Sequence, residues 1–350
     1  MDIVYEFVPY GEPFEPLPGS IVLDVGMRTV PGVIDHHHPD AEPECTASLL
    51  VKHPELVLDH LGPYRSGTQQ TGRPALRIIT HRLPDFDALA SIFLTLELLK
   101  KGGVDSSMQK LARYTRLVDS ASLPERIDLS ATPYSILRAL FSGPRKDESE
   151  INRMRVAEGL KFMNFLYSKA EEGYEIEENR LLYSGIDRYL RAMRKVENDY
   201  FHYLDDLQRG NKLVLNLPRL ERTGHRPVDA LIIRNPTSFL LKEWARRDRA
   251  QSSLGKGFSL LVTGFGAQRY ILGVDPARGV NLRGLGGMLN EREHLKRAHN
   301  ADSSRPCWYE GNCPFFNYRI IDSPQEGTLL SDQDLIDCLM SFSRNISGAG

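Results

Sequence analysis

Residues 20–38 read SIVLDVGMRTVPGVIDHHH, and residues 76–91 read LRIITHRLPDFDALAS. Each stretch begins as a short apolar run rich in β-branched residues, which is typical of a buried strand, and ends in carboxylate and imidazole side chains. In an open α/β sheet, ligands bind at the carboxyl ends of the strands. We therefore expect the two stretches to form two halves of one site, and these side chains suit a metal ion.

The composition is that of an ordinary globular protein. The chain has 350 residues, of which 41% are hydrophobic and 26% charged, and its net charge at pH 7 is −2. This length suits two domains, and the near-neutral charge disfavours long nucleic acids as partners. Neither an apolar run of about 18 residues nor a signal-peptide pattern is present, so we expect a cytoplasmic protein without membrane association. The spacing of the four cysteines suits reduced thiols.

The order of the expected elements indicates an α/β catalytic domain with a mainly parallel sheet over 1–145. A helical connector is expected over 146–210, and a smaller α/β or α+β domain over 211–350. Residues 1–19 hold four prolines and are expected to be an extended lead-in, and 62–74 a surface loop. Strands are expected at 20–24, 32–35, 75–80, 212–217, 228–234, 258–262 and 270–274. Helices are expected at 45–61 with a break at Pro54, 87–101, 108–119, 133–141, 148–172, 176–208, 237–247 and 332–343.

The second stretch carries one candidate group of ligands. His81 ends the expected strand, and Asp85 and Asp87 follow at the start of the expected helix. Carboxylate oxygens combined with one imidazole nitrogen suit Mn²⁺, whereas Mg²⁺ and Ca²⁺ sites favour oxygen ligands alone. The alternative is that both aspartates cap the helix and that His81 is a surface histidine.

The first stretch carries the other candidate group. Asp24 follows the three apolar residues 21–23, and a charged group there is costly unless it is paired or bound to a metal. Asp35, His36, His37 and His38 follow a second apolar run, and a neighbouring carboxylate can orient an imidazole for metal binding. The alternative is a polar turn that happens to be rich in histidine.

The motifs Asp35-His36-His37 and His81-x-x-Pro84-Asp85-x-Asp87-Ala88-x-x-Ser91 together resemble those of the DHH phosphoesterase superfamily. That superfamily includes RecJ-type exonucleases, nanoRNases, cyclic-dinucleotide phosphodiesterases, family II pyrophosphatases and exopolyphosphatases. The resemblance covers roughly residues 20–120. Family members normally carry the H-x-x-P-D-x-D motif first, whereas in this chain it follows the Asp-His-His motif.

The resemblance implies a site for two divalent ions, usually Mn²⁺, with Mg²⁺ or Co²⁺ as alternatives. The implied metal ligands are Asp24, which would bridge the ions, and His36, His81, Asp85, Asp87 and Asp119. Asp59 is the alternative to Asp119 as the last aspartate of the pattern. The implied catalytic residues are Asp24, Asp35 and His37, with His37 near the phosphate. The extra histidine, His38, leaves open by one position which imidazole is the ligand.

The C-terminal part contains candidate substrate-binding residues. DHH proteins commonly carry a Gly-Gly-Gly-His loop there, and the nearest match is Gly286-Gly287, which no histidine follows. Backbone N–H groups of this loop, with Arg278 and Arg283, would suit a phosphate, and His38 is a further candidate. The alternative is a glycine turn that opens a helix.

These observations predict a metal-dependent phosphohydrolase. Two metal ions activate a water molecule in such sites. We expect hydrolysis of a phosphodiester in a nucleotide-like molecule or a short oligonucleotide, which would make the protein a phosphodiesterase or a small nuclease. The alternatives are a pyrophosphatase or exopolyphosphatase, and a nucleotide-binding regulatory protein that keeps the fold without turnover. Whether the protein is an enzyme or a regulatory protein, it could form a homodimer.

Overall fold

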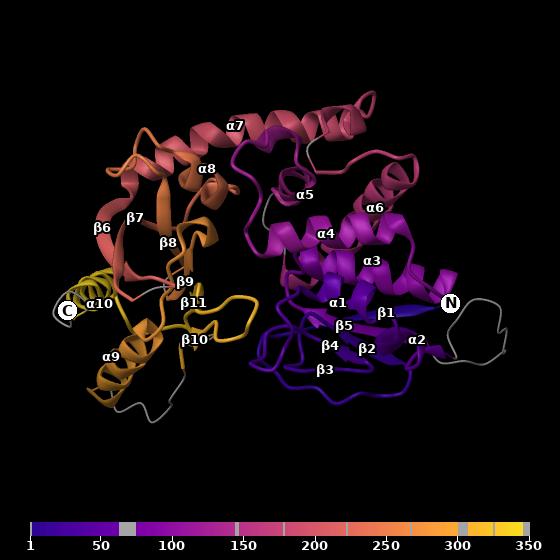
Figure 1. Ribbon diagram of the computed structural model, residues 1–350, viewed down its shortest axis with the longest axis horizontal. Helices are drawn as coiled ribbons and strands as arrows, with labels where there is room; N and C mark the ends of the chain where they lie inside the picture. Colours follow the sequence, from indigo (N-terminus) through magenta and orange to yellow (C-terminus); the bar gives the residue numbers. More distant parts are fainter. Residues whose placement is uncertain are drawn as a thin grey trace. The chain divides into compact units, whose positions relative to one another are not determined.

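The computed structural model shows a mixed α/β protein (Figure 1). It describes residues 2–62, 75–143, 147–177, 179–221, 223–266, 268–299, 307–324 and 326–345. The described residues form two sheets and ten α-helices. They group into two compact units: residues 1–196 with 313–315, and residues 197–312 with 316–350. Except for Gly62, the loop expected over 62–74 lies outside the described residues.

The first unit contains a five-stranded sheet in the order β1-β5-β2-β4-β3. Its strands are β1 (Ile3–Val8), β2 (Ser20–Leu23), β3 (Thr29–Val30), β4 (Val33–Ile34) and β5 (Leu76–His81). The first four in spatial order are parallel, and only β3 runs antiparallel to its neighbour. The expectation of a mainly parallel sheet is therefore confirmed. Every residue of β2 and β4 is buried, as their continuous apolar sequence predicts.

The expectation of an extended lead-in over residues 1–19 is wrong for its first half. Residues 3–8 form β1, which pairs along its whole length with β5, with Ile3 opposite Leu76 and Val8 opposite His81. The prolines begin only at Pro9, so they end this strand rather than prevent it. The strand forms through a partner about seventy residues away, which local sequence patterns do not reveal.

The helices of the first unit follow the expected pattern. They are α1 (Thr46–Lys52), α2 (Glu55–Leu58), α3 (Phe86–Lys101), α4 (Ser106–Asp119), α5 (Pro133–Phe141) and α6 (Glu148–Glu171). The predicted break between α1 and α2 occurs at Pro54. Side-chain caps begin four of these helices, and Gly102 ends α3 in the left-handed conformation. Helices α1, α3, α4 and α6 pack on one another, and α1 and α3 contact the sheet (Figure 1).

Residues 146–210, which were expected to form a separate helical connector, belong instead to the two compact units. Helix α6 packs on α3 and α4 within the first unit. Helix α7 (Asp187–Arg209) begins in the first unit and ends in the second. The helix expected from residue 176 begins only at Asp187, and the described residues before it contain the 3-10 turn Arg180–Tyr183 instead. Gly185 interrupts the chain there with a φ of 74°, a left-handed conformation that ends helices.

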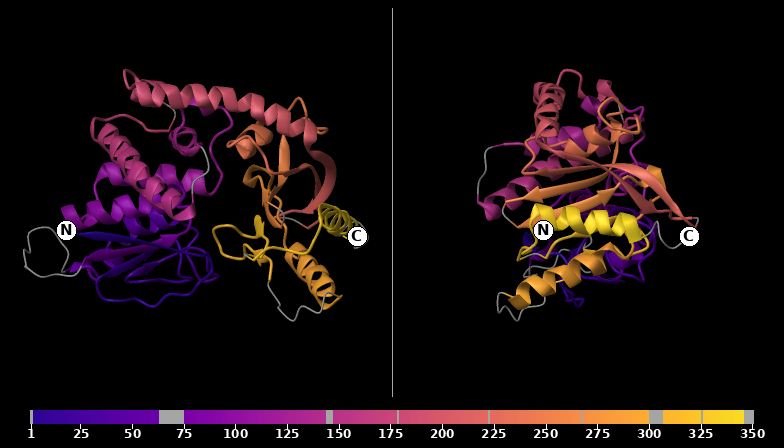
Figure 2. Two further views of the ribbon diagram at one scale, coloured as in Figure 1. Left: turned by 180° about the vertical axis from the view of Figure 1, so that it is seen from behind. Right: turned by 90° about the vertical axis from the view of Figure 1, so that its left-hand side faces the viewer.

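The second unit contains a six-stranded, mostly antiparallel sheet in the order β10-β11-β9-β8-β7-β6. Its strands are β6 (Asn211–Pro218), β7 (His225–Arg234), β8 (Phe258–Phe265), β9 (Arg269–Val274), β10 (Tyr309–Glu310) and β11 (Ile320–Asp322). Only β7 and β8 are parallel. Helices α9 (Leu285–His299) and α10 (Asp332–Asn345) cover one face of this sheet, and α7 and α8 (Leu241–Arg247) cover the other (Figures 1 and 2). The four expected strands are confirmed, whereas β10 and β11 were not expected, and α9 corresponds to the alternative in which Gly286-Gly287 opens a helix.

Two buried aspartates fix the C-terminal half of α7. Asp199 accepts hydrogen bonds from the Ser238 hydroxyl (2.7 Å) and from the backbone N–H groups of Phe239 (2.9 Å) and Leu240 (3.0 Å). Asp206 accepts from the backbone N–H groups of Thr237 and Ser238, each at 2.8 Å. These carboxylates therefore satisfy the backbone donors that precede α8. No described helix is long and apolar enough to cross a membrane.

A close backbone approach near β8 gives the first prediction. Gly255 and Gly257 have φ angles of 67° and 77°, and a Cβ atom on Gly257 would overlap the carbonyl oxygen of Arg246, whereas one on Gly255 meets nothing within 4 Å. We expect Gly255→Ala to lose about 1–2 kcal/mol of stability from backbone strain alone. Gly257→Ala should lose about 1–3 kcal/mol more, because the overlap displaces backbone. Urea unfolding of both variants measures the difference, and equal losses would contradict the close approach.

Candidate metal centre

Three parallel strands bring the candidate ligands to one edge of the first sheet. Asp24 follows β2, Asp35 follows β4, and His81 is the last residue of β5. Because β5, β2 and β4 are neighbours with the same direction, their carboxyl ends meet. The chain turns directly after β2, where Asp24 has a φ of 62°, and its N–H donates to the Ile34 carbonyl at 2.9 Å. This left-handed residue is strained, as residues at functional sites often are.

Asp24 lies at the centre of the cluster. Its side chain is buried, and its carboxylate contacts imidazoles from both stretches: Oδ2 lies 3.3 Å from His81 Nε2, and Oδ1 lies 3.4 Å from His36 Nδ1. Burial raises the pKa of Asp24, and the imidazoles of His81 and His37 oppose that shift. A carboxylate buried at this position needs positive charge close by.

Asp24, His81 and Asp85 form the first group of ligand atoms, which lie within 4.8 Å of one another. His81 Nδ1 donates to the Arg82 carbonyl at 2.8 Å, so Nε2 is the nitrogen that faces the carboxylates. Asp85 Oδ1 lies 3.8 Å from that Nε2 and also caps α3 by accepting from Ala88 N at 3.1 Å. The Tyr10 hydroxyl lies 3.0 Å from the same Nε2, and its ring stacks on the imidazole.

His36, Asp87 and Asp119 form a second group within the same distance. The Thr46 hydroxyl donates to Asp24 Oδ1 at 3.1 Å, so it accepts from His36 Nδ1, which lies 3.1 Å away. Nε2 of His36 is therefore the nitrogen that can serve as a ligand, and it lies 3.4 Å from Asp119 Oδ2 at the end of α4. Burial lowers the pKa of His36, which keeps it neutral as a ligand must be.

The first turn of α1 positions Asp87. The backbone N–H groups of Thr46 and Ala47 donate to its two carboxylate oxygens, both at 2.9 Å. Burial raises the pKa of Asp87, and the nearby carboxylates of Asp24 and Asp119 raise it further. Thr46 and Tyr10 are not among the site residues predicted from the sequence. A threonine opening an expected helix is a weak signal for Thr46, and Tyr10 has none.

Asp24, Asp35, His36 and His37 form the third candidate group of ligand atoms, in which His37 pairs with Asp35. His37 Nδ1 donates to Asp35 Oδ1 at 2.7 Å, and Asp35 Oδ2 accepts from Met27 N at 2.7 Å. Burial disfavours the charged form of both side chains, but their mutual attraction outweighs it. The pKa of His37 therefore lies well above its usual range, and that of Asp35 lies below. Asp35 therefore orients the His37 ring and favours its charged form.

Helix α6 supports the loop between His81 and Asp85. Leu83 has a φ of 57°, and its N–H donates to Asn152 Oδ1 at 2.7 Å. Arg155 donates from Nη1 to the Leu83 carbonyl at 2.7 Å. These two contacts satisfy the N–H and carbonyl groups of Leu83, which has a left-handed backbone conformation that residues other than glycine rarely adopt. Neither Asn152 nor Arg155 is among the site residues predicted from the sequence.

The donor set fits divalent metal ions. Five carboxylates and three imidazoles from both stretches and from α4 converge, and Asp24 and His36 each belong to two of the three candidate groups. In the part of the chain that the structure describes, no lysine or arginine forms an ion pair with Asp24 or Asp87. Among the described residues, the ion-pair partners of these two carboxylates are imidazoles. Oxygen donors mixed with imidazole nitrogen suit Mn²⁺ or a similar first-row ion.

The remaining predicted residues lie outside this cluster. Asp59 is an exposed residue at the end of α2, and His38 Nε2 lies 3.1 Å from the Thr29 hydroxyl. Arg278, Arg283, Gly286 and Gly287 belong to the second unit. There the N–H groups of Gly284 and Gly286 donate to Glu310 Oε1 (2.8 and 3.2 Å), so this carboxylate occupies the glycine turn that opens α9.

Metal affinity should rise with pH, because the metal-free site holds protons that a metal must displace. Burial lowers the pKa of His81, but Asp24 and Asp85 outweigh it and raise this pKa to about 10. His81 is therefore protonated in the metal-free protein at neutral pH, and binding at Nε2 releases that proton. We expect the Mn²⁺ association constant to increase up to about tenfold per pH unit below this pKa. Calorimetry in buffers of different ionisation enthalpy measures the released protons, and a pH-independent affinity would contradict the expectation.

The comparison with known proteins adds no family to these observations. No model of a protein family matches the chain, and a search of curated proteins returns no match.

Proposed function

We propose that the protein is a metal-dependent phosphohydrolase of the DHH type that cleaves a phosphodiester in a nucleotide-like molecule or a short oligonucleotide. The observation that carries this proposal is the position of Asp24, one buried carboxylate that contacts His81 on one side and His36 on the other. A carboxylate shared between two adjacent ligand groups is the arrangement that a two-metal site requires.

The residues of each group have distinct roles in this proposal. Asp24, His81 and Asp85 would hold one ion, and His36, Asp87 and Asp119 would hold the other, with Asp24 also belonging to a group that contains His36. Such a pair of ions supplies an activated water and neutralises charge on the phosphoryl oxygens. The Thr46 hydroxyl and the first turn of α1 keep Asp24, His36 and Asp87 in place, since each donates or accepts a hydrogen bond there.

His37 would act on the substrate itself. Asp35 holds its Nδ1–H and raises its pKa, so His37 is charged at neutral pH. An imidazolium in this position can donate a hydrogen bond to a phosphoryl oxygen and a proton to the leaving oxygen. Its side chain is 18% exposed, whereas that of His36 is 1% exposed. The more accessible of the two histidines is therefore the one assigned to the substrate.

The test is hydrolysis of a small panel of substrates with Mn²⁺ and after chelation. The panel holds an aryl phosphodiester, a dinucleotide, a cyclic dinucleotide, pyrophosphate and a longer polyphosphate. Turnover that requires Mn²⁺ and is lost in Asp85→Ala but kept in Asp59→Ala would support the proposal, because Asp59 is exposed and outside both groups.

The preferred substrate separates the remaining alternatives. Preference for a dinucleotide or cyclic dinucleotide would support a diesterase, and preference for pyrophosphate or polyphosphate would identify a phosphoanhydride hydrolase instead. Metal binding without turnover of any member would overturn the enzymatic proposal and favour a nucleotide-binding regulatory protein.

A further inference from the structure

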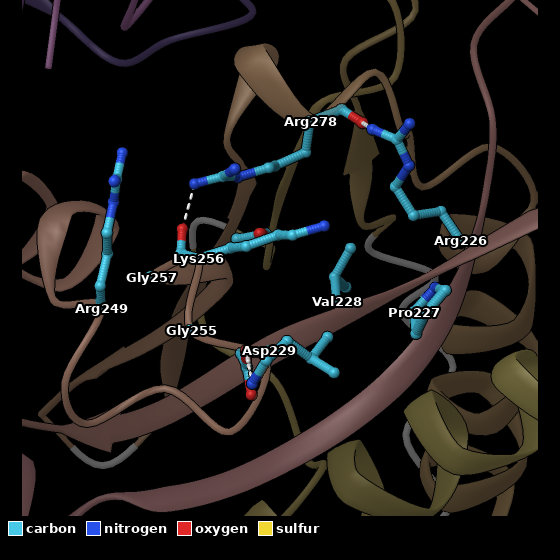
Figure 3. Close-up of a pocket in the computed structure, with 11 residues that line it drawn as sticks. Arg226, Pro227, Val228, Asp229, Arg249, Gly255, Lys256, Gly257 and Arg278 are labelled. Atoms are coloured by element: carbon cyan, nitrogen blue, oxygen red, sulfur yellow. Dashed lines mark hydrogen bonds between the residues drawn. The ribbon is translucent and has the colours of Figure 1, made fainter.

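The second unit contains a cavity of about 360 Å³ at one end of its sheet. Its walls come from the first half of β7, the loop between α8 and β8, and the turn after β9. The lining includes four cationic side chains, which are Arg226, Arg249, Lys256 and Arg278, and one carboxylate, Asp229. Figure 3 shows the Lys256 side chain running alongside that of Arg278, with Arg249 and Arg226 to either side.

The loop that carries Lys256 is fixed by hydrogen bonds. Asp229 accepts from Ser253 N and Leu254 N, both at 2.9 Å, and the Ser252 hydroxyl accepts from Gly257 N at 2.9 Å. The left-handed Gly255 and Gly257 flank Lys256 and turn the chain sharply on both sides of it. The lysine is therefore placed at the cavity by a defined turn rather than by a mobile surface loop.

Arg226 and Arg278 are likewise held in position. Arg226 Nη1 donates to the Arg278 carbonyl at 2.6 Å, and Arg278 donates to the Lys256 carbonyl. Arg278 Nε also lies 3.3 Å from Asp275 Oδ2, and this guanidinium is only 17% exposed. Three chain segments far apart in sequence are thus tied together through the backbones that carry the cations (Figure 3).

The charge of the cavity is not balanced by its own residues. Four positive charges against the single negative charge of Asp229 leave a lining charge of about +3, reduced in part by Asp275 behind Arg278. Neither Arg226 nor the Lys256 ammonium forms an ion pair with a carboxylate among the described residues. Like charges that line one cavity repel one another, and an anion in the cavity would reduce that repulsion.

We propose that this cavity binds a small anion with two linked phosphate groups, such as pyrophosphate or the diphosphate of a nucleotide. Two linked phosphates carry about three negative charges near neutral pH, which matches the lining. Arginine and lysine are the side chains that bind phosphate most strongly, through charge-assisted hydrogen bonds. The cavity volume lies at the lower end of the range for small-molecule pockets, so it suits a small ligand of this size.

The site is independent of the proposed hydrolytic activity, because every residue that forms it belongs to the second unit. The experiment is therefore done on the full chain with a chelator present, so that no metal ion can recruit phosphate elsewhere. Isothermal titration calorimetry with pyrophosphate, orthophosphate and adenosine diphosphate measures binding. Tighter binding of adenosine diphosphate than of pyrophosphate would assign the ligand to nucleotides, and the reverse order would assign it to inorganic diphosphate.

Two variants and a matched control make the test specific. Lys256→Gln and Arg226→Gln should each weaken pyrophosphate binding about tenfold or more, since each removes a charge-assisted hydrogen bond. Arg269→Gln removes an equal charge from an exposed residue at the opposite end of β9 and should leave binding unchanged. Failure of the wild-type protein to bind pyrophosphate, or equal binding by all three variants, would overturn the proposal.

Discussion

Replacement of Asp24 by asparagine is expected to abolish hydrolysis and to weaken binding of both metal ions. Asp24 is the carboxylate that both ligand groups approach, with His81 Nε2 at 3.3 Å and His36 Nδ1 at 3.4 Å. Asparagine keeps the shape of the side chain and removes its charge, so the packing around it is preserved. Loss of metal-supplied charge stabilisation of several kcal/mol corresponds to a fall in kcat of about a thousandfold or more.

The Asp24→Asn variant also separates function from folding. The Thr46 hydroxyl can still donate to the amide oxygen, and the removed charge relieves repulsion from Asp87, whose pKa the Asp24 carboxylate raises. The metal-free variant should therefore be at least as stable as the metal-free wild type. Metal content after equilibrium dialysis against Mn²⁺ gives the stoichiometry, with Asp59→Asn as the control. Two tightly bound ions in Asp24→Asn would show that this carboxylate does not bridge them.

Replacement of His37 by glutamine is expected to lower kcat about 10²–10⁴-fold while metal stoichiometry stays unchanged. His37 is held by Asp35 at 2.7 Å and belongs to a candidate group with Asp24, Asp35 and His36, but to neither of the two groups proposed to hold an ion. Its loss removes a proton donor and a positive charge near the phosphoryl group. The fall should therefore appear mainly in kcat rather than in metal affinity.

His38→Gln provides the comparison, because His38 is the adjacent imidazole, lies 3.1 Å from the Thr29 hydroxyl and belongs to none of the three candidate groups. Steady-state kinetics and Mn²⁺ titration of both variants measure the two effects. The assignment of His37 would fail if His38→Gln lost as much activity. It would also fail if His37→Gln lost its metal, since His37 would then be a ligand.

The strand-end positions of the candidate ligands could be predicted from sequence because they depend on local pattern. A short apolar run ending in Asp24 or His81 marks a buried strand, and neighbouring parallel strands end at the same edge. The structure brings Asp119 rather than Asp59 to this edge, which sequence spacing had left open. The contacts of Thr46, Tyr10 and Asn152 could not be predicted, because each joins residues between 22 and 71 positions apart.

Dependence on distant partners and short length also explain why several elements were not predicted. Strand β1 exists through pairing with β5, and β10 and β11 are only two and three residues long, too short for a periodic pattern. Helix α9 begins with Leu285-Gly286-Gly287, and glycine lowers helix propensity where the helix starts. Its first turn is instead fixed by the Glu310 carboxylate, which lies more than twenty positions away.

The support that α6 gives to the loop at Leu83 limits how this protein can change over evolutionary time. The loop and the two side chains that hold it, Asn152 and Arg155, are about seventy residues apart in the chain. Any recombination or truncation that keeps the loop but replaces α6 would leave the Leu83 backbone unsupported, even with every candidate ligand intact. The smallest fragment that keeps the metal centre supported must therefore include α6 at least as far as Arg155, so the loop and α6 must evolve together.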